Sequence, residues 1–97
     1  MSYLITITED RRLSLLLVLA ETPGYCTNAF LLQSAVLSIY GHSASVDQIK
    51  TDIAWLGEQG LVTARATGDV MLATLTTRGA DVAAGRASVP GVKKPMP

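Results

Sequence analysis

The sequence predicts one small α+β domain that is mainly helical, because three helical patterns are followed by two alternating patterns typical of β-strands. Its 97 residues suffice for one domain with a single hydrophobic core. Hydrophobic residues make up 48% of the chain and charged residues 16%, a balance that excludes intrinsic disorder over most of its length. The fold therefore depends on the order of these patterns along the chain.

The composition also bears on where the protein works. The longest apolar stretch, residues 15–20, is far shorter than the roughly 20 residues of a membrane-spanning helix. No basic segment precedes an apolar one at the N-terminus, so no secretory signal is expected. The single cysteine, Cys26, has no internal disulfide partner and is interpreted as a small buried hydrophobic residue. We expect a soluble protein in a reducing cytoplasm, with no membrane partner.

The first predicted helix spans residues 9–21. Thr8 is its candidate N-cap, and two carboxylates follow in the first turn, where they favour the exposed N–H groups and the helix dipole. Pro23 with its neighbouring glycine ends the helix. Residues 2–7 are β-branched and aromatic, and we expect them to form an extended arm.

The leucines of this first helix cover more than one of its faces. One apolar face suffices for the core of a monomer, so the surplus needs a further partner, either a helix of the same chain or one of a second chain. Taking the second alternative, we predict a homodimer with Leu15, Leu16 and Leu19 at its interface.

A second helix is predicted up to Tyr40. Thr27 or Asn28 caps it, and its apolar residues recur at helical spacing. Gly41 stands at the usual left-handed C-terminal position.

A third helix follows after a short connection and spans about residues 46–59. Ser45 and Gln48 form a capping-box pattern at its start, and Gly60 closes it. An apolar stripe at spacings of three and four makes it amphipathic. The stripe consists of Val46, Ile49, Ile53 and Leu56.

After Gly60 the hydrophobic period changes from 3.6 to 2. Two alternating runs flank the pair Gly68-Asp69 and predict a β-hairpin. Thr76 or Thr77 can cap a last short helix that runs through residue 84. We expect residues 87–97, which hold three of the four prolines, to form a flexible basic tail outside a domain of residues 1–86.

Three helices followed by a two-stranded hairpin is the arrangement of the winged helix-turn-helix. Its third helix normally enters the major groove of DNA, and the hairpin is the wing. Two local motifs agree with this fold. The run Leu56 to Val62 is similar to the "Leu-x-x-x-Gly-Leu-Val" join of bacterial winged-helix regulators, and Leu75 to Gly79 resembles the "Leu-Thr-x-x-Gly" that follows their wing.

Most of the chain, residues 9–95, resembles a family of small winged-helix proteins encoded by Mu-like phages and prophages and often labelled as similar to the ArsR class of regulators. The resemblance is carried by five segments: Glu9 to Leu13, Pro23 to Tyr25, Gly41 to Ser43, Asp52 to Val62, and Ala84 to Arg86 with Val89 to Lys93. It implies a phage protein with a DNA-binding type of domain, acting inside the bacterial host cell.

Candidate DNA contacts lie on the predicted third helix and at its entrance. Glutamine pairs with adenine and lysine with guanine or phosphate, while hydroxyl groups at a helix N-terminus bind phosphate. The candidates are Ser43, Ser45, Gln48, Lys50 and Thr51. The alternative is an ordinary solvated helix face. One lysine against three acidic residues gives residues 45–60 a charge of −2, which favours that alternative.

The wing and the tail hold the second set of candidates. Five basic against two acidic residues give residues 61–97 a charge of +3, whereas three basic against six acidic give residues 1–60 a charge of −3. The net charge of zero therefore consists of a negative first part and a positive second part of the chain. Phosphate contacts are expected from Arg65, Arg78, Lys93 and Lys94. The tail is equally compatible with a solubilising end or a docking peptide for a protein partner.

Three further interpretations concern residues near these candidates. Trp55 is expected to pack against the wing or the first helix. Arg11 and Arg12 are expected to pair with Glu9, Asp10 or solvent. His42 is interpreted as structural or solvated, with phosphate contact as its alternative.

Metal binding and catalysis are not expected. One cysteine and one histidine cannot complete a tetrahedral site, and no nucleophile elbow or glycine-rich phosphate loop is present. We predict no cofactor, no metal and no enzymatic activity.

The leading prediction is a phage or prophage DNA-binding protein that regulates transcription, as a homodimer on paired half-sites. The alternative is a winged-helix protein-interaction module, serving as a phage assembly or packaging accessory, in which the acidic third helix meets a phage or host protein.

Overall fold

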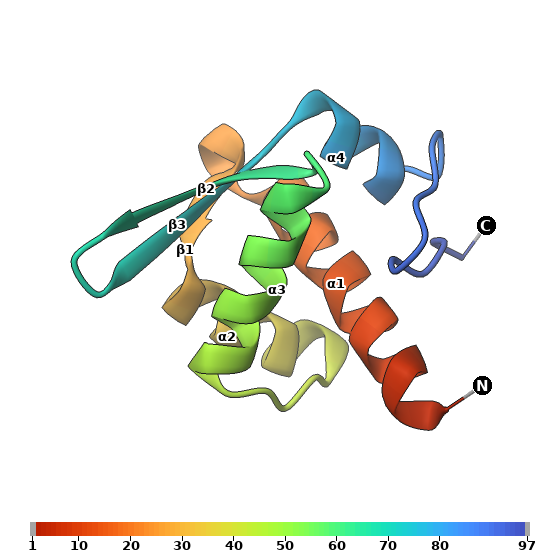
Figure 1. Cartoon of the computed structure of the whole chain (residues 1–97), viewed down its shortest axis with the longest axis horizontal. Helices are drawn as coiled ribbons and strands as arrows, with labels where there is room; N and C mark the ends of the chain where they lie inside the picture. The colour runs from red at the N-terminus through yellow and green to blue at the C-terminus, as the bar shows by residue number, and fades with distance from the viewer. Residues whose placement is uncertain (1, 97) are drawn as a thin grey trace.

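The computed structural model describes residues 2–96, over which the chain forms four α-helices, one short 3-10 helix and three strands (Figure 1). In chain order the elements are α1 (Tyr3–Glu21), η1 (Pro23–Tyr25), β1 (Cys26–Asn28), α2 (Ala29–Tyr40), α3 (Val46–Glu58), β2 (Val62–Thr67), β3 (Val70–Leu75) and α4 (Thr77–Ala83). The predicted mainly helical α+β class is confirmed.

The three strands form one antiparallel sheet in the order β1-β3-β2. β2 and β3 pair from Val62 with Leu75 to Thr67 with Val70, so the predicted hairpin with its Gly-Asp turn is confirmed. Its tip projects away from the helices, at the left of Figure 1. β1, which was not predicted, pairs with the other edge of β3. Three residues are too few to show a strand period of their own.

Most helix ends follow the predicted capping. Of the two candidates for α2, Asn28 is the N-cap: its side chain accepts a hydrogen bond from the Leu31 amide at 2.9 Å. Gly41 ends α2 with φ of 73°. α4 is capped by Thr76, whose hydroxyl accepts from the Gly79 amide at 3.0 Å.

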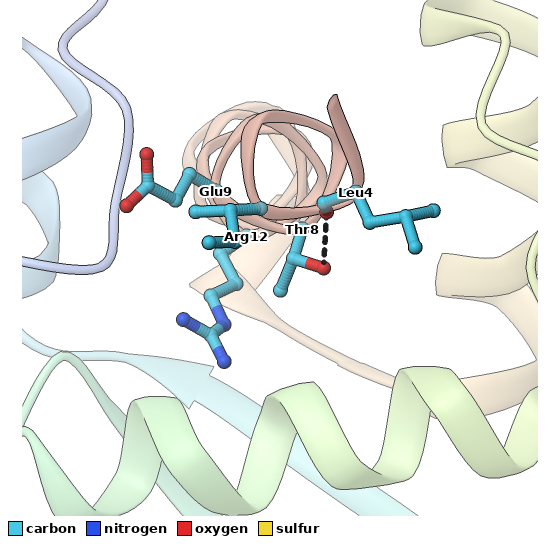
Figure 2. A pocket seen from close by; sticks show the side chains of 5 residues that line it. Leu4, Thr8, Glu9 and Arg12 are labelled. Atoms are coloured by element: carbon cyan, nitrogen blue, oxygen red, sulfur yellow. Dashed lines mark hydrogen bonds between the residues drawn. The ribbon is translucent and has the colours of Figure 1, made fainter. Parts of the chain in front are cut away.

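The extended N-terminal arm is a wrong prediction, since α1 begins at Tyr3. Ser2 is the N-cap, accepting from the Leu4 amide at 3.1 Å. Thr8, the predicted cap, lies inside the helix and donates its hydroxyl to the Leu4 carbonyl at 3.0 Å, the bond drawn in Figure 2. The low helix propensity of the β-branched residues is overridden because extending an existing helix is easier than starting one.

The three leucines predicted at a dimer interface lie instead in the core of a single chain. Leu15 and Leu16 are fully buried and Leu19 is 1% exposed within a single chain. α1 contacts α2, α4 and β3, so elements of its own chain cover its several apolar faces. The first alternative, a partner within the same chain, therefore accounts for the surplus leucines.

The C-terminal segment is packed against the domain, although a flexible tail was expected. Residues 87–96 contain no helix or strand. Val89 and Val92 are nevertheless 9% and 7% exposed and belong to the hydrophobic core. The core therefore extends beyond the predicted boundary at residue 86.

Candidate nucleic-acid interface

The exposed face of α3 carries the candidate contacts of that helix. Ile49, Ile53 and Leu56 are buried, and the opposite face is in solvent. The exposed side chains are those of Asp47, Gln48, Thr51, Ala54 and Glu58. β2 follows α3 directly and packs against it, so the hairpin stands beside this face (Figure 1).

The entrance of α3 is held by the predicted capping box. The Ser45 hydroxyl accepts from the Gln48 amide at 3.0 Å, and the Gln48 side-chain oxygen accepts from the Ser45 amide at 2.9 Å. Both polar side chains are thus engaged in holding the helix. Ser43 is exposed and has no hydrogen bond within residues 2–96.

Ser45→Ala should lower the free energy of unfolding by about 1 kcal/mol, because one amide in the first turn of α3 loses its acceptor. Urea titration followed by the fluorescence of Trp55 measures this change. Ser43→Ala is the matched control and should leave the midpoint unchanged. Equal effects of the two substitutions would contradict the capping role.

Lys50 joins α3 to the tip of the hairpin. Its Nζ donates to the Asp69 carbonyl at 3.3 Å and lies 5.8 Å from the centroid of the Phe30 ring. The ammonium group is therefore positioned between α2, α3 and the turn of the hairpin. Thr51, on the same helix, donates its hydroxyl to the Asp47 carbonyl at 2.9 Å.

Asp52 does not belong to the exposed face, which corrects the charge attributed to α3. It is 2% exposed and forms ion pairs with Arg11 and with Arg12 of α1, the latter at 3.6 Å between Arg12 Nε and Asp52 Oδ1. The expected pairing of these arginines with Glu9, Asp10 or solvent is wrong. The half-buried Lys50 and the exposed Asp47 and Glu58 remain, so the charge that α3 presents is −1 instead of −2.

Arg12 also packs on Trp55, as predicted for a contact of this tryptophan with the first helix. The guanidinium carbon lies 3.9 Å from the centroid of the ring. Figure 2 shows Arg12 extending from α1 toward α3, while Glu9 points sideways, to the left of the view. These two residues line an open groove of about 280 Å³ along α1, together with Leu4, Ile5 and Thr8.

The predicted basic contacts are not gathered at one place. Arg65 is exposed on β2. Arg78 donates to the Gln59 carbonyl at 2.6 Å, at the end of α3. Lys93 lies 3.4 Å from Asp10 of α1, and Lys94 is exposed in the C-terminal segment. Of the basic candidates, Lys50 therefore lies on α3 at the tip of the hairpin. Ala64 faces Gly57 of α3, so Arg65, the next residue of β2, points to the other face of the hairpin.

His42 has a structural partner. Its Nε2 lies 2.7 Å from Asp10 Oδ2, and its side chain is 12% exposed. Asp10 thus connects the segment between α2 and α3 to α1. The sequence contains the two residues but gives no signal that they meet, because 32 positions separate them.

The space between α3 and β2 is open. A groove of about 610 Å³ lies there, and small residues contribute much of its lining, among them Ala54, Gly57 and Ala64. Within residues 2–96, no three histidine, cysteine or carboxylate side chains are grouped as metal ligands. Over the same range, no helix has the length and apolar character needed to cross a membrane.

These features define a small α+β protein that presents the polar face of one helix beside a projecting hairpin. The chain is 46% identical over 91 residues to the protein described as uncharacterized protein gp26 of Escherichia phage Mu, covering 94% of this chain and 93% of that protein. It belongs to this family of Mu-like phage proteins. An uncharacterized protein of Haemophilus influenzae (strain KW20/Rd) is 42% identical over 79 residues, covering 80% of this chain and 76% of that protein. No family model and no solved structure matches the chain.

Proposed function

We propose that the chain is a winged helix-turn-helix protein that binds DNA and regulates transcription of a Mu-like phage in the bacterial cytoplasm, without catalytic activity. The observation that carries the proposal is the placement of α3 next to the hairpin, with Lys50 of α3 at the hairpin tip and Arg65 exposed on β2. A recognition helix beside a wing is how this class of fold contacts a major groove and the neighbouring phosphates.

The charge of −2 over residues 45–60 argued against DNA contact, but the burial of Asp52 removes part of that argument and so supports the proposal. Its carboxylate is compensated by two arginines and faces α1, so it does not repel a nucleic acid in front of α3. The remaining charge on α3 and the hairpin is −1, since Lys50 and Arg65 stand against Asp47, Glu58 and Asp69. Binding should therefore be modest and depend on the wing as much as on α3.

Arg65→Ala should weaken binding to all DNA sequences about equally, by roughly three- to tenfold at low salt, and reduce the slope of log affinity against log salt by about 0.9. Fluorescence anisotropy of labelled phage DNA at several salt concentrations measures both quantities. Arg86→Ala is the matched control, because Arg86 is exposed and pairs with Asp81 of α4. No binding by the unmodified chain, or an equal loss with both variants, would refute the proposal.

A second candidate function, the protein-interaction module, is favoured by the apolar residues in solvent at the start of α1 and along α2. Those that are more than half exposed are Tyr3, Leu4, Leu31, Leu37 and Ile39. Such a surface is typical of protein contacts. Selection of bound fragments from random and phage DNA at two salt concentrations separates the candidates, because an interaction module should enrich no sequence.

A further inference from the structure

The solvent side of α3 carries one row of exposed side chains, which we call the outer row. Its members are Asp47, Thr51, Ala54 and Glu58. They follow one another at spacings of four, three and four residues, which places them above one another on a single face of an α-helix. The outer row is therefore the surface that α3 would present to a DNA groove.

The outer row has an unusual chemical character for a surface that meets DNA. The carboxylates of Asp47 and Glu58 accept hydrogen bonds and donate none when ionised. The Thr51 hydroxyl donates to the Asp47 carbonyl at 2.9 Å, so its remaining free groups are oxygen lone pairs and a methyl group. Ala54 adds a second methyl group. The outer row thus offers acceptors and methyl groups, and its donor is already used within the helix.

The donor side chains nearest to the start of the outer row are engaged elsewhere. The Lys50 ammonium group donates to the Asp69 carbonyl at the tip of the hairpin, at 3.3 Å. The side-chain oxygen of Gln48 accepts from the Ser45 amide in the capping box, at 2.9 Å. Recognition of guanine by lysine or of adenine by glutamine would first have to break these contacts.

The base edge that matches this surface best is that of cytosine. In the major groove cytosine presents an amino donor alone, whereas guanine presents two acceptors and thymine presents an acceptor beside its methyl group. Adenine presents an amino donor next to an acceptor, so a carboxylate meets attraction and repulsion together. A carboxylate facing a base therefore selects cytosine, and a methyl group facing a base favours thymine.

Asp47 is the carboxylate placed to meet a base edge. It is the second residue of α3, and the N-terminal residues of a recognition helix are those that contact bases. Ala54 lies about 10 Å further along the helix axis, which corresponds to about three base pairs. Glu58 is the last residue of α3 and lines the groove beside β2, on the side where a wing meets phosphates.

We propose that Asp47 reads a cytosine by accepting a hydrogen bond from its N4 amino group, and that the methyl groups of Thr51 and Ala54 contact thymine methyl groups within the next three base pairs. The inference rests on the DNA binding proposed above and names the bases at that site. The negative charge of α3 then contributes specificity, because at any other base the carboxylate is repelled or left without a partner.

The test begins with selection of bound fragments from random DNA, followed by fluorescence anisotropy on the enriched site. The unmodified chain should prefer cytosine over guanine or thymine at one position by about five- to twentyfold. Asp47→Asn should move this preference to adenine, because asparagine pairs with N6 and N7 of adenine. Asp47→Ala should lose the preference and bind other sequences about two- to fivefold more tightly, since a charge that repels phosphates is gone.

Glu58→Ala is the matched control, because it removes the same charge from the other end of the outer row. It should tighten binding to all sequences about equally and keep the preference for cytosine. Asp47 also lies in the first turn of α3, where a carboxylate stabilises the helix dipole. That role alone would lower the urea midpoint of Asp47→Asn without changing the preferred base.

The methyl contacts are tested without any change to the protein. Replacing the thymines of the enriched site by deoxyuridine removes only their methyl groups, and should weaken binding of the unmodified chain about threefold. An unchanged affinity would contradict the contacts of Thr51 and Ala54.

The selection separates failure of this inference from failure of DNA binding. If no sequence is enriched at low or at moderate salt, DNA binding is refuted and the reading of cytosine falls with it. If a sequence is enriched and the unmodified chain, Asp47→Asn and Asp47→Ala all prefer the same bases, DNA binding stands and the role of Asp47 is overturned.

Discussion

Gly79→Ala should lower the free energy of unfolding by about 3 kcal/mol or more, a large share of the stability of a domain of this size. Gly79 lies in α4 directly against the main chain of Leu61. A Cβ at this position would overlap the Leu61 carbonyl oxygen and lie 2.8 Å from Leu75 Cδ1. Main-chain atoms cannot move aside as a flexible side chain can, so α4 must shift away from the sheet.

The neighbouring hydrogen bonds explain why such a shift is costly. The Leu61 carbonyl accepts from the Thr76 amide at 3.1 Å, and the Thr76 hydroxyl donates to the Gly60 carbonyl at 2.7 Å. Arg78 donates to the Gln59 carbonyl. The "Leu-Thr-x-x-Gly" motif thus binds the main chain between α3 and β2, and its glycine, Gly79, is where α4 comes closest to Leu61.

Gly57→Ala is the matched control for this prediction. A Cβ at Gly57 would lie 3.5 Å from Ala64 Cβ, an ordinary van der Waals distance. Because alanine has the higher helix propensity, this substitution in α3 should be neutral or stabilise by up to about 1 kcal/mol. Urea unfolding measures both variants. A Gly79→Ala midpoint close to that of Gly57→Ala would show that α4 does not approach Leu61 in this way.

The helices and the hairpin were predictable because their signals are local. The capping box of Ser45 and Gln48 predicts the start of α3. Gly41 and Gly60 stand where the turns after α2 and α3 require a positive φ. The period of 2 around the Gly-Asp turn defines β2 and β3. Each of these signals lies within a few residues of the feature that it specifies.

The parts that sequence reasoning missed depend on contacts between distant residues. Arg12 and Gly91 are 79 positions apart, and Arg11 and Asp52 are 41 apart. β1 is a strand only because β3 lies beside it. One signal was present for Asp52, which stands three residues after Ile49 and four before Leu56, and therefore on the buried stripe of α3.

The buried position of Asp52 changes the charge of the candidate site. A carboxylate counted on the solvent side of α3 was evidence against nucleic acid, but Asp52 faces α1 between two guanidinium groups. The separation of charge between residues 1–60 and residues 61–97 is also reduced, because Lys93 lies next to Asp10 of α1. Charge counts along the chain thus describe the candidate surface less well than the exposed residues do.

Asp52→Ala should destabilise the fold by about 3 to 5 kcal/mol, because it leaves two poorly exposed guanidinium groups without their carboxylate. The side chains of Arg11 and Arg12 are 12% and 19% exposed. The Arg12 Nε atom is buried and has no hydrogen bond within residues 2–96, so its ion pair with Asp52 is the interaction that compensates its charge. Urea unfolding of the variant measures the loss.

Glu58→Ala is the matched control, since it removes an exposed carboxylate from the same helix and should change stability by no more than about 0.5 kcal/mol. Arg11→Met in the Asp52→Ala background should recover part of the loss, because one unpaired charge then disappears. Additive effects of these two substitutions would show that Arg11 and Asp52 are not coupled. Since Asp52 also fixes Arg12 beside Trp55, the same variant should shift the emission of Trp55 in the folded state, whereas Glu58→Ala should not.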